Sequence, residues 1–468
     1  MTVPLFFLGL PVVASMAAYA LRRWVWLQTV IATATALVLA LLALQIPLDQ
    51  VAVIFGRETA FDSSWVVLGR SLTFGPDDRP ALAFVFLAAG VFFGGAAAAR
   101  VSRSFLPVAL AMLTLLVATL FVQPFLFAAL FLEIIAALAA LMLSDERHPR
   151  TLGALRLLVF VTLGVPFILL AGWQLEGYSA SPDDVALLGR AALLLGIGFF
   201  ILLSIVPFHS WLASVAEEAP PYAAAYVFTV FQASIVFMML NSLNQFDWLR
   251  ANMTFFATLR WGGLAMVVVG GAFAFAQRSM GRLMGYAVLI DFGASIVAVG
   301  LGTADGLRAA LAIVALRGIG LAVWGLGMGV LVGAPGDDDL DRIRGWARQC
   351  PFATAAVVLG GLSIAGFPLT AGFAGRWALY RLLAADNLNL AFVLLLASAS
   401  VILAYAVALR PMLAQPEAGE DGAPLSEDAP SMVYAGIGVA VVLVLGVFPQ
   451  WLLPAVTRAA AAFSSLVQ

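Results

Sequence analysis

Fourteen apolar runs, each about 20 residues long, follow one another along the sequence. A bilayer core is about 30 Å thick, and a helix crosses it with roughly 20 apolar residues. The sequence therefore predicts an all-α integral membrane protein with about fourteen transmembrane helices. The first run lacks a basic leader and a small-residue cleavage site, so we expect a retained helix. The runs lie near residues 4–21, 25–45, 81–99, 104–122, 124–143, 153–173, 186–206, 222–243, 254–276, 281–301, 306–333, 351–383, 386–409 and 431–452.

Composition narrows the chemistry that the chain can carry. Charged residues are 11% of the total, against about a quarter in soluble domains. All 24 basic residues are Arg, and there is one Cys, Cys350, beside two His. This excludes disulfide frameworks and Cys/His metal or iron–sulfur sites within the chain. No glycine-rich nucleotide-binding loop is found, so we expect no metal, cofactor or nucleic acid to bind here.

The arginines between the runs are distributed unequally over the two sides. Alternate numbering of the connections puts twelve Arg on one side and four on the other. The positive-inside rule then predicts both termini on the outer side of a bacterial inner membrane. Two connections, 46–80 outside and 416–430 inside, are polar, and we expect both to be solvated. The twelve are Arg22, Arg23, Arg100, Arg103, Arg147, Arg150, Arg278, Arg282, Arg342, Arg344, Arg348 and Arg410.

Four ionisable residues lie deep inside apolar runs: Glu133, Asp291, Arg317 and Arg376. A charge inside the bilayer is costly and usually marks an ion path. The alternative is an internal salt bridge that only fixes helix packing. Two further arginines nearer the run ends are expected to reach toward the interface with their head groups. They are Arg156 and Arg260.

Two segments carry helix-breaking residues inside or beside apolar runs. Freed backbone groups are tolerated in a membrane only where protein or water satisfies them, and broken helices beside buried charges are common in ion-translocating proteins. The first segment, 204–221, contains Pro207, Pro220 and Pro221. The second, 361–377, contains Gly366, Pro368, Gly372 and Gly375 and ends beside Arg376.

The motifs around these breaks carry a family resemblance. VPFHSWLASVAEEAP (206–220) resembles the VPFHxWxPDxxxxAP signature of the N, M and L subunits of bacterial complex I and of Mrp antiporters. LSIAGFPLTAGFAGRWALY (362–380) resembles LSLAGIPPTAGFxGKFxLF of the same family. TFGPDDRPALAFVF, FLEIIAAL, RLMGYAVLIDFG and LVLGVFPQWLL are also similar. Together these segments extend over roughly residues 66–452.

The resemblance implies two inverted five-helix repeats, each with one broken helix, and a polar axis through the membrane. The repeats would span about 104–243 and 254–410, flanked by helices in 1–99 and 431–452, in a single polytopic domain. It also implies partner membrane subunits in the same bilayer, with quinone bound only by those partners. An N-like or M-like position is favoured, because few residues follow the last run.

Only some of the family's functional residues are kept at the matching positions of this sequence. Glu133 matches the family's glutamate, whereas its usual lysine partner falls at Leu202. The central lysine falls at Gln232, or at Ala233 if the register shifts by one. A family histidine falls at Asp291 and the lysine of GFxGK at Arg376. Arg317 stands where several sister subunits carry a lysine.

These departures reduce the number of residues that can exchange protons. A buried Lys can release its proton, whereas Arg keeps its proton at any accessible pH. Glu133, Asp291 and His209 are then the groups left to exchange protons, and His209 is expected near the inner surface at an entry path. We predict that Glu133 is buried and without a basic partner.

Three functional interpretations stay open. The first is an antiporter-like subunit of a complex I type NADH/quinone oxidoreductase, taking part in proton translocation. The second is a subunit of an Mrp-type cation/proton antiporter or of a proton-coupled inorganic carbon transporter. The third is a non-pumping scaffold between active subunits.

Overall fold

The computed structural model describes residues 2–46, 48, 51–54, 57–67, 69–75, 78–144, 151–332, 338–415 and 426–467. Arg147, Arg150 and residues 416–425 of the second polar connection lie outside these ranges. Within them, nine helices are long and apolar enough to cross a membrane. They are α1 (Val3–Ala20), α2 (Val25–Gln45), α6 (Leu152–Ala180), α9 (Pro221–Gln245), α11 (Met253–Ala274), α12 (Met280–Val299), α13 (Ala304–Leu331), α17 (Leu388–Leu413) and α18 (Ala429–Val447).

Five shorter apolar helices complete the set that the fourteen apolar runs predict. Two are continued by a second helix after a non-helical break: α7 by α8 (Ser210–Glu218), and α15 by α16 (Phe373–Asp386). Each break falls in the fourth span of a five-span series, one running from α4 to α9 and the other from α11 to α17. The predicted fold class is therefore confirmed. The five are α3 (Arg79–Gly95), α4 (Phe105–Phe121), α5 (Ala128–Leu143), α7 (Ala186–Leu202) and α15 (Pro351–Ala365).

The first break is shorter than the sequence suggests. It spans residues 203–209 and contains Pro207, because residues 210–218 form the helix α8. Pro220 and Pro221 instead begin α9, at its N-cap and first position. A proline is well accommodated there, since the first backbone N–H groups of a helix have no intrahelical partner. Assigning Pro220 to the break was therefore wrong.

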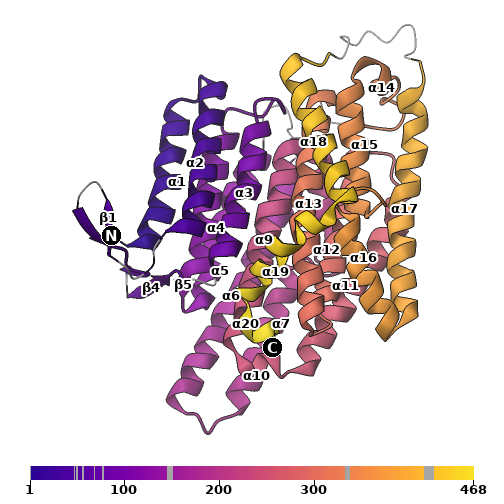
Figure 1. Cartoon of the computed structure of the whole chain (residues 1–468). Coiled ribbons are helices and arrows are strands. Elements are labelled where there is room, and N and C mark those ends of the chain that lie inside the picture. The colour runs from indigo at the N-terminus through magenta and orange to yellow at the C-terminus, as the bar shows by residue number, and fades with distance from the viewer. Residues whose placement is uncertain are drawn as a thin grey trace.

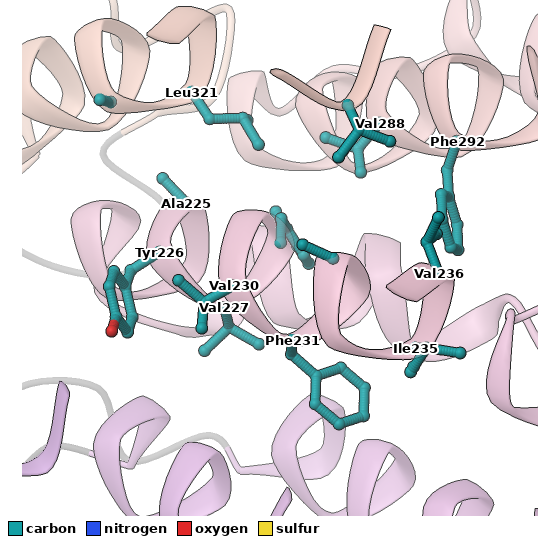
Figure 2. Close-up of a cluster of buried hydrophobic side chains, with 14 of the residues drawn as sticks. Ala225, Tyr226, Val227, Val230, Phe231, Ile235, Val236, Val288, Phe292 and Leu321 are labelled. Atoms are coloured by element: carbon teal, nitrogen blue, oxygen red, sulfur yellow. The ribbon is translucent and has the colours of Figure 1, made fainter. Parts of the chain in front are cut away.

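The centre of the bundle is built from α9, α12 and α13, which are almost entirely buried. Figure 2 shows α9 side chains such as Val230 and Val236 beside Val288 and Phe292 of α12 and Leu321 of α13. The outer helices differ, because they carry many exposed leucines, valines and phenylalanines. Exposed apolar faces around a fully packed centre are what a bilayer solvent allows.

The first polar connection, 46–80, is predicted to be solvated, and its described residues also form secondary structure. It contains two antiparallel hairpins, and the left-handed φ of 74° at Gly69 lies in the turn of the second. Valine-rich stretches with polar neighbours favour such pairing. The strands are β1 (Val51–Ile54), β2 (Arg57–Ala60), β3 (Ser64–Val67), β4 (Arg70–Thr73) and β5 (Val122–Gln123), which pairs with β4.

The C-terminal segment returns across the bundle. After α18 and a short 3-10 turn (Pro449–Trp451), α19 (Leu453–Ala461) packs against α13 and α3, and α20 (Ser464–Val467) packs against α9. In Figure 1 this yellow segment runs down the front of the bundle, and the C-terminus lies at the end opposite the α1–α2 turn. The N-terminus lies at the end of α1 that is opposite the α1–α2 turn. Three short elements complete the chain: α10 (Asp247–Arg250), α14 (Trp346–Gln349) and a 3-10 turn at Phe125–Phe127.

Candidate functional site

The second break is shaped by two glycines. Gly366 ends α15 in the left-handed region, with φ 75°, and a Cβ there would stand 2.7 Å from Cγ of Arg376. A Cβ on Gly372 would stand 1.9 Å from the carbonyl oxygen of Ser363. The Gly372 N–H donates to Ser363 Oγ at 3.0 Å. Glycine is therefore needed at both positions for the chain to fold back tightly enough to turn Arg376 into the bundle.

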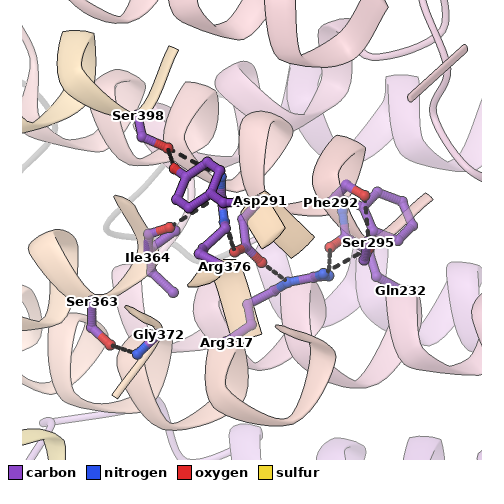
Figure 3. A network of polar contacts seen from close by, with 11 residues as sticks. Gln232, Asp291, Phe292, Ser295, Arg317, Ser363, Ile364, Gly372, Arg376 and Ser398 are labelled. Carbon is purple, nitrogen blue, oxygen red and sulfur yellow. Dashed lines mark hydrogen bonds and ion pairs between the residues drawn. The ribbon is translucent and has the colours of Figure 1, made fainter. Parts of the chain in front are cut away.

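Arg376 meets two other predicted residues in a buried triad. Its Nη2 and Nε lie 3.1 and 3.3 Å from Asp291 Oδ1, and Arg317 Nε donates to Asp291 Oδ2 at 2.6 Å. The exposed fractions of Arg376, Asp291 and Arg317 are 0, 4 and 2%. Figure 3 shows Asp291 of α12 between Arg317 of α13 and Arg376 of α16. We call these three residues the charged triad.

Neutral partners take up the remaining guanidinium donors. Arg317 donates to Gln232 Oε1 at 2.9 Å and to Ser295 Oγ at 3.3 Å. Arg376 donates to Ser398 Oγ at 3.2 Å and to the Ile364 carbonyl at 3.3 Å. Charges buried away from water are tolerable when such hydrogen bonds accompany the ion pair. The polar cluster is thus held by side chains of α9, α12, α13, α16 and α17 and by one backbone carbonyl near the end of α15.

The charges of the triad do not cancel. Two guanidiniums stand against one carboxylate, so with Asp291 ionised the cluster carries one net positive charge. Neither arginine can release a proton under physiological conditions. The cluster is therefore a source of fixed charge rather than a proton donor. Arg376 lies ten residues, about 15 Å, before the end of α16 and is fully buried.

Glu133 lies apart from the triad, and no hydrogen bond or ion pair between described residues joins them. It is half-buried on α5, between the exposed side chains of Leu130 and Ile134, so the expected full burial is wrong. Thr162 Oγ1 of α6 donates to Glu133 Oε1 at 2.6 Å. In the described part of the chain, the buried Oε2 has no partner and no arginine reaches salt-bridge distance.

The two positions where the family carries lysines behave differently. Leu202 is buried at the end of α7 against Gly164 of α6, which makes an apolar contact in place of an ion pair. Gln232 is fully buried on α9 and belongs to the polar cluster through Arg317. Only the second position has kept a polar role.

His209 caps the start of α8 and is half-buried, with no hydrogen-bond partner for Nδ1 in the described residues. The nine residues of α8, about 13 Å in length, separate His209 from the end of the span. His209 therefore lies deeper than the expected place near the inner surface. Trp211 Nε1 donates to Ser204 Oγ at 2.8 Å and closes the break. Sequence reasoning missed this contact, whose one signal is a Ser and a Trp on either side of Pro207.

Arg156 and Arg260 do more than reach toward the interface. Arg156 donates to Ser214 Oγ at 2.7 Å and so joins α6 to α8. Arg260 of α11 forms an ion pair with Asp386 at the end of α16. Ser295 and Ser398, which accept hydrogen bonds from the charged triad, were also missed, although each is a hydroxyl within an apolar run. Such hydroxyls are the signal that could have found them.

Fold and site together define a polytopic helical membrane protein with two five-span series, each broken in its fourth span, and a buried charge cluster at the second break. Residues 190–404 match the family described as NADH:quinone oxidoreductase/Mrp antiporter, TM. The match covers 215 of the 468 residues.

The similarity extends to curated relatives. The chain is 30% identical over 280 residues to NADH-quinone oxidoreductase subunit N of Parafrankia sp., covering 57% of this chain and 51% of the relative. It is 28% identical over 303 residues to formate hydrogenlyase subunit 3 of Escherichia coli, covering 58% and 48%. The chain thus spans about half the length of the curated relatives it matches.

Solved structures share the fold over nearly the whole chain. A chain of the Mrp complex from Dietzia sp. superposes with a TM-score of 0.80 at 14% identity, covering 99% of both chains. A chain of respiratory complex I from Thermus thermophilus superposes with a TM-score of 0.73 at 23% identity, covering 98% of this chain and all of that one. At these identities the likeness concerns the fold.

Proposed function

We propose that this chain is an antiporter-like membrane subunit of a complex I type assembly and takes part in proton translocation coupled to quinone reduction on partner subunits. The observation that carries the proposal is the charged triad at the second helix break. Burying three charges in an apolar bundle is costly, and ion-translocating proteins bear this cost at their conduction sites. The family match over residues 190–404 and the matched relatives support the host complex.

Different residues take different parts in the proposed translocation. Glu133 is the proton-exchanging group: Thr162 donates to Oε1, which leaves Oε2 as the oxygen that binds and releases the proton. The charged triad acts as a fixed field, because Asp291 stands between two permanent cations. His209, with a free Nδ1 at the first break, is a second exchange group on the same route.

The proposed setting is a bacterial inner membrane, with both termini on the outer side and other membrane subunits alongside. The unequal arginine distribution supports this orientation. Both chain ends lie at the end of the bundle opposite the arginine-bearing α1–α2 turn (Figure 1). Structural neighbours in multi-subunit membrane complexes support partner subunits.

Replacing Glu133 with glutamine tests the proposal. The amide keeps the size and an acceptor for Thr162 but cannot carry a proton, so we expect fewer protons pumped per electron at unchanged electron transfer. The measurement is proton uptake by vesicles containing the whole purified complex, recorded beside quinone reduction. Glu176→Gln, at the exposed end of α6, is the matched control and should pump as the parent does.

The scaffold function is the second candidate, because neither arginine of the charged triad can release a proton. It makes the opposite prediction for the same experiment. A Glu133→Gln complex that pumps as many protons per electron as the parent would remove this chain from the proton route and favour the scaffold.

Arg376 gives a separate prediction. Arg376→Lys keeps the positive charge in a group that can lose its proton when buried, so translocation should be kept or increased. Arg376→Ala leaves the neutral Arg317–Asp291 pair and changes the field, so translocation should fall while electron transfer continues. Proton pumping and electron transfer are compared for both variants. Equal pumping by the Ala variant at equal turnover would place Arg376 outside the machinery.

A further inference from the structure

A cavity of about 1120 Å³ opens at the arginine-rich end of the bundle, and no residue of the charged triad lines it. Its walls are the α1–α2 turn, the α3–α4 connection and Ser144, the residue directly after α5. Four arginines line it, and the described lining contains no acidic side chain. They are Arg22, Arg23, Arg100 and Arg103. We call this the arginine cavity.

The walls of the cavity are held in place by buried polar contacts. Gln28, 1% exposed, donates from Nε2 to the Ala18 carbonyl at 2.8 Å and to the Arg103 carbonyl at 3.4 Å. This side chain joins the two arginine-bearing connections. On the other side, Ser431 Oγ of α18 donates to the Ala98 carbonyl at 3.0 Å. The four guanidiniums therefore project from a fixed backbone.

Most of the positive charge in the cavity is uncompensated. The guanidiniums of Arg23 and Arg103 have no hydrogen-bond or ion-pair partner among the described residues. Arg22 lies over the Tyr19 ring, with Cζ 5.0 Å from the centroid. Arg100 donates to the Ser426 carbonyl at 2.9 Å and lies 4.0 Å from Asp428. Guanidiniums converging on one space favour an anionic group with several acceptor oxygens, and phosphate has this chemistry.

The surroundings of the cavity favour a lipid as the source of that phosphate. Tyr19, Trp24 and Trp26 are 59, 62 and 73% exposed beside it, and such aromatic residues gather at the headgroup level of membranes. Farther along α1, exposed Val13 and Met16 present an apolar face on which acyl chains can lie. Basic pockets between transmembrane helices at the arginine-rich side suit anionic headgroups.

We propose that the arginine cavity binds the phosphate headgroup of an anionic glycerophospholipid, whose acyl chains run along α1 and α2. The guanidiniums of Arg23 and Arg103 are the principal ligands, because neither has a partner within the part of the chain that the structure describes. Ser102 and Ser104, whose hydroxyl oxygens lie 3.2 Å apart, add donors for the glycerol or phosphate oxygens. Neither the proton route nor the charged triad is needed for this binding.

The test uses the full chain, purified in neutral detergent, stripped of lipid and titrated with phosphatidylglycerol or phosphatidylcholine. Native mass spectrometry counts the lipids retained. We expect the parent to bind phosphatidylglycerol at least tenfold more tightly than phosphatidylcholine. The double variant Arg23→Gln, Arg103→Gln should lose this preference, with an unchanged circular dichroism spectrum and melting temperature. Arg278→Gln, an exposed arginine in the α11–α12 connection, is the control and should keep it.

Three outcomes would overturn the proposal. The first is equal binding of the two lipids by the parent. The second is an undiminished preference in the folded double variant. The third is displacement of phosphatidylglycerol by inorganic phosphate at equal concentration, which would identify a site for a free anion. Failure of the proton-pumping experiment on Glu133 would leave the lipid proposal intact, because the two measurements share no residue.

Discussion

Replacing Asp291 with asparagine is expected to lower the free energy of unfolding by about 3–5 kcal/mol, the usual cost of removing one partner from a buried ion pair. The carboxylate faces Arg317 at 2.6 Å and Arg376 at 3.1 Å, and all three side chains are shielded from water. Without it, two guanidiniums would share one buried space with no anion. Unfolding of the purified chain in mixed micelles, titrated with sodium dodecyl sulfate, measures the change.

Two further variants separate the charge effect from simple loss of contacts. Asp291→Asn combined with Arg376→Gln returns the cluster to one net positive charge, so part of the lost stability should be recovered. Asp305→Asn breaks an exposed pair with Arg308 on the same helix as Arg317 and should cost less than about 1 kcal/mol. An Asp291→Asn chain as stable as the Asp305→Asn chain would show that the charged triad contributes nothing to the fold.

Gly372→Ala is expected to be nearly as damaging, by about 3 kcal/mol or more, because it places a methyl group against backbone. The new Cβ would stand 1.9 Å from the Ser363 carbonyl oxygen, a distance that a side-chain rotation cannot relieve. The two halves of the broken helix would have to move apart, and Arg376 would move with the start of α16. Both the sodium dodecyl sulfate unfolding curve and proton pumping by the assembled complex should be affected.

Gly196→Ala provides the matched comparison. Gly196 lies inside α7, and a Cβ there would meet no atom within 4 Å. Alanine is the better helix former by roughly 1 kcal/mol, so this variant should be neutral or slightly more stable. If Gly372→Ala behaves in the same way, the second break is not as tightly closed as its glycine contacts indicate.

Much of the architecture could be predicted because it depends on local composition. Apolar runs of bilayer length fix the number of spans, and Gly366, Pro368 and Gly372 mark the second break by their own backbone preferences. The first break was placed too broadly, because Pro207 and Pro220 look alike in sequence. Only the helix formed by residues 210–218 separates the residue that breaks a span from the one that begins the next.

The candidate site was predictable as a set of residues but not as an arrangement. Asp291, Arg317 and Arg376 stand out because each is an ionisable group in an apolar run. Glu133 stands out for the same reason, yet it lies half-exposed at the side of the bundle. The sequence pattern is the same for a side chain turned toward the centre and one turned toward the edge, since apolar residues surround both.

The sequence by itself determined that this chain is a multi-span membrane protein and that two of its spans are broken. It also determined which charged residues lie within apolar runs. Bilayer thickness, backbone conformational preferences and the cost of desolvation act on each segment separately, so they can be deduced from each segment. Tertiary structure alone decided that Asp291 pairs with Arg317 and Arg376, from positions 26 and 85 residues away. Pairing depends on how α12, α13 and α16 pack around α9, and that packing is a property of the whole bundle.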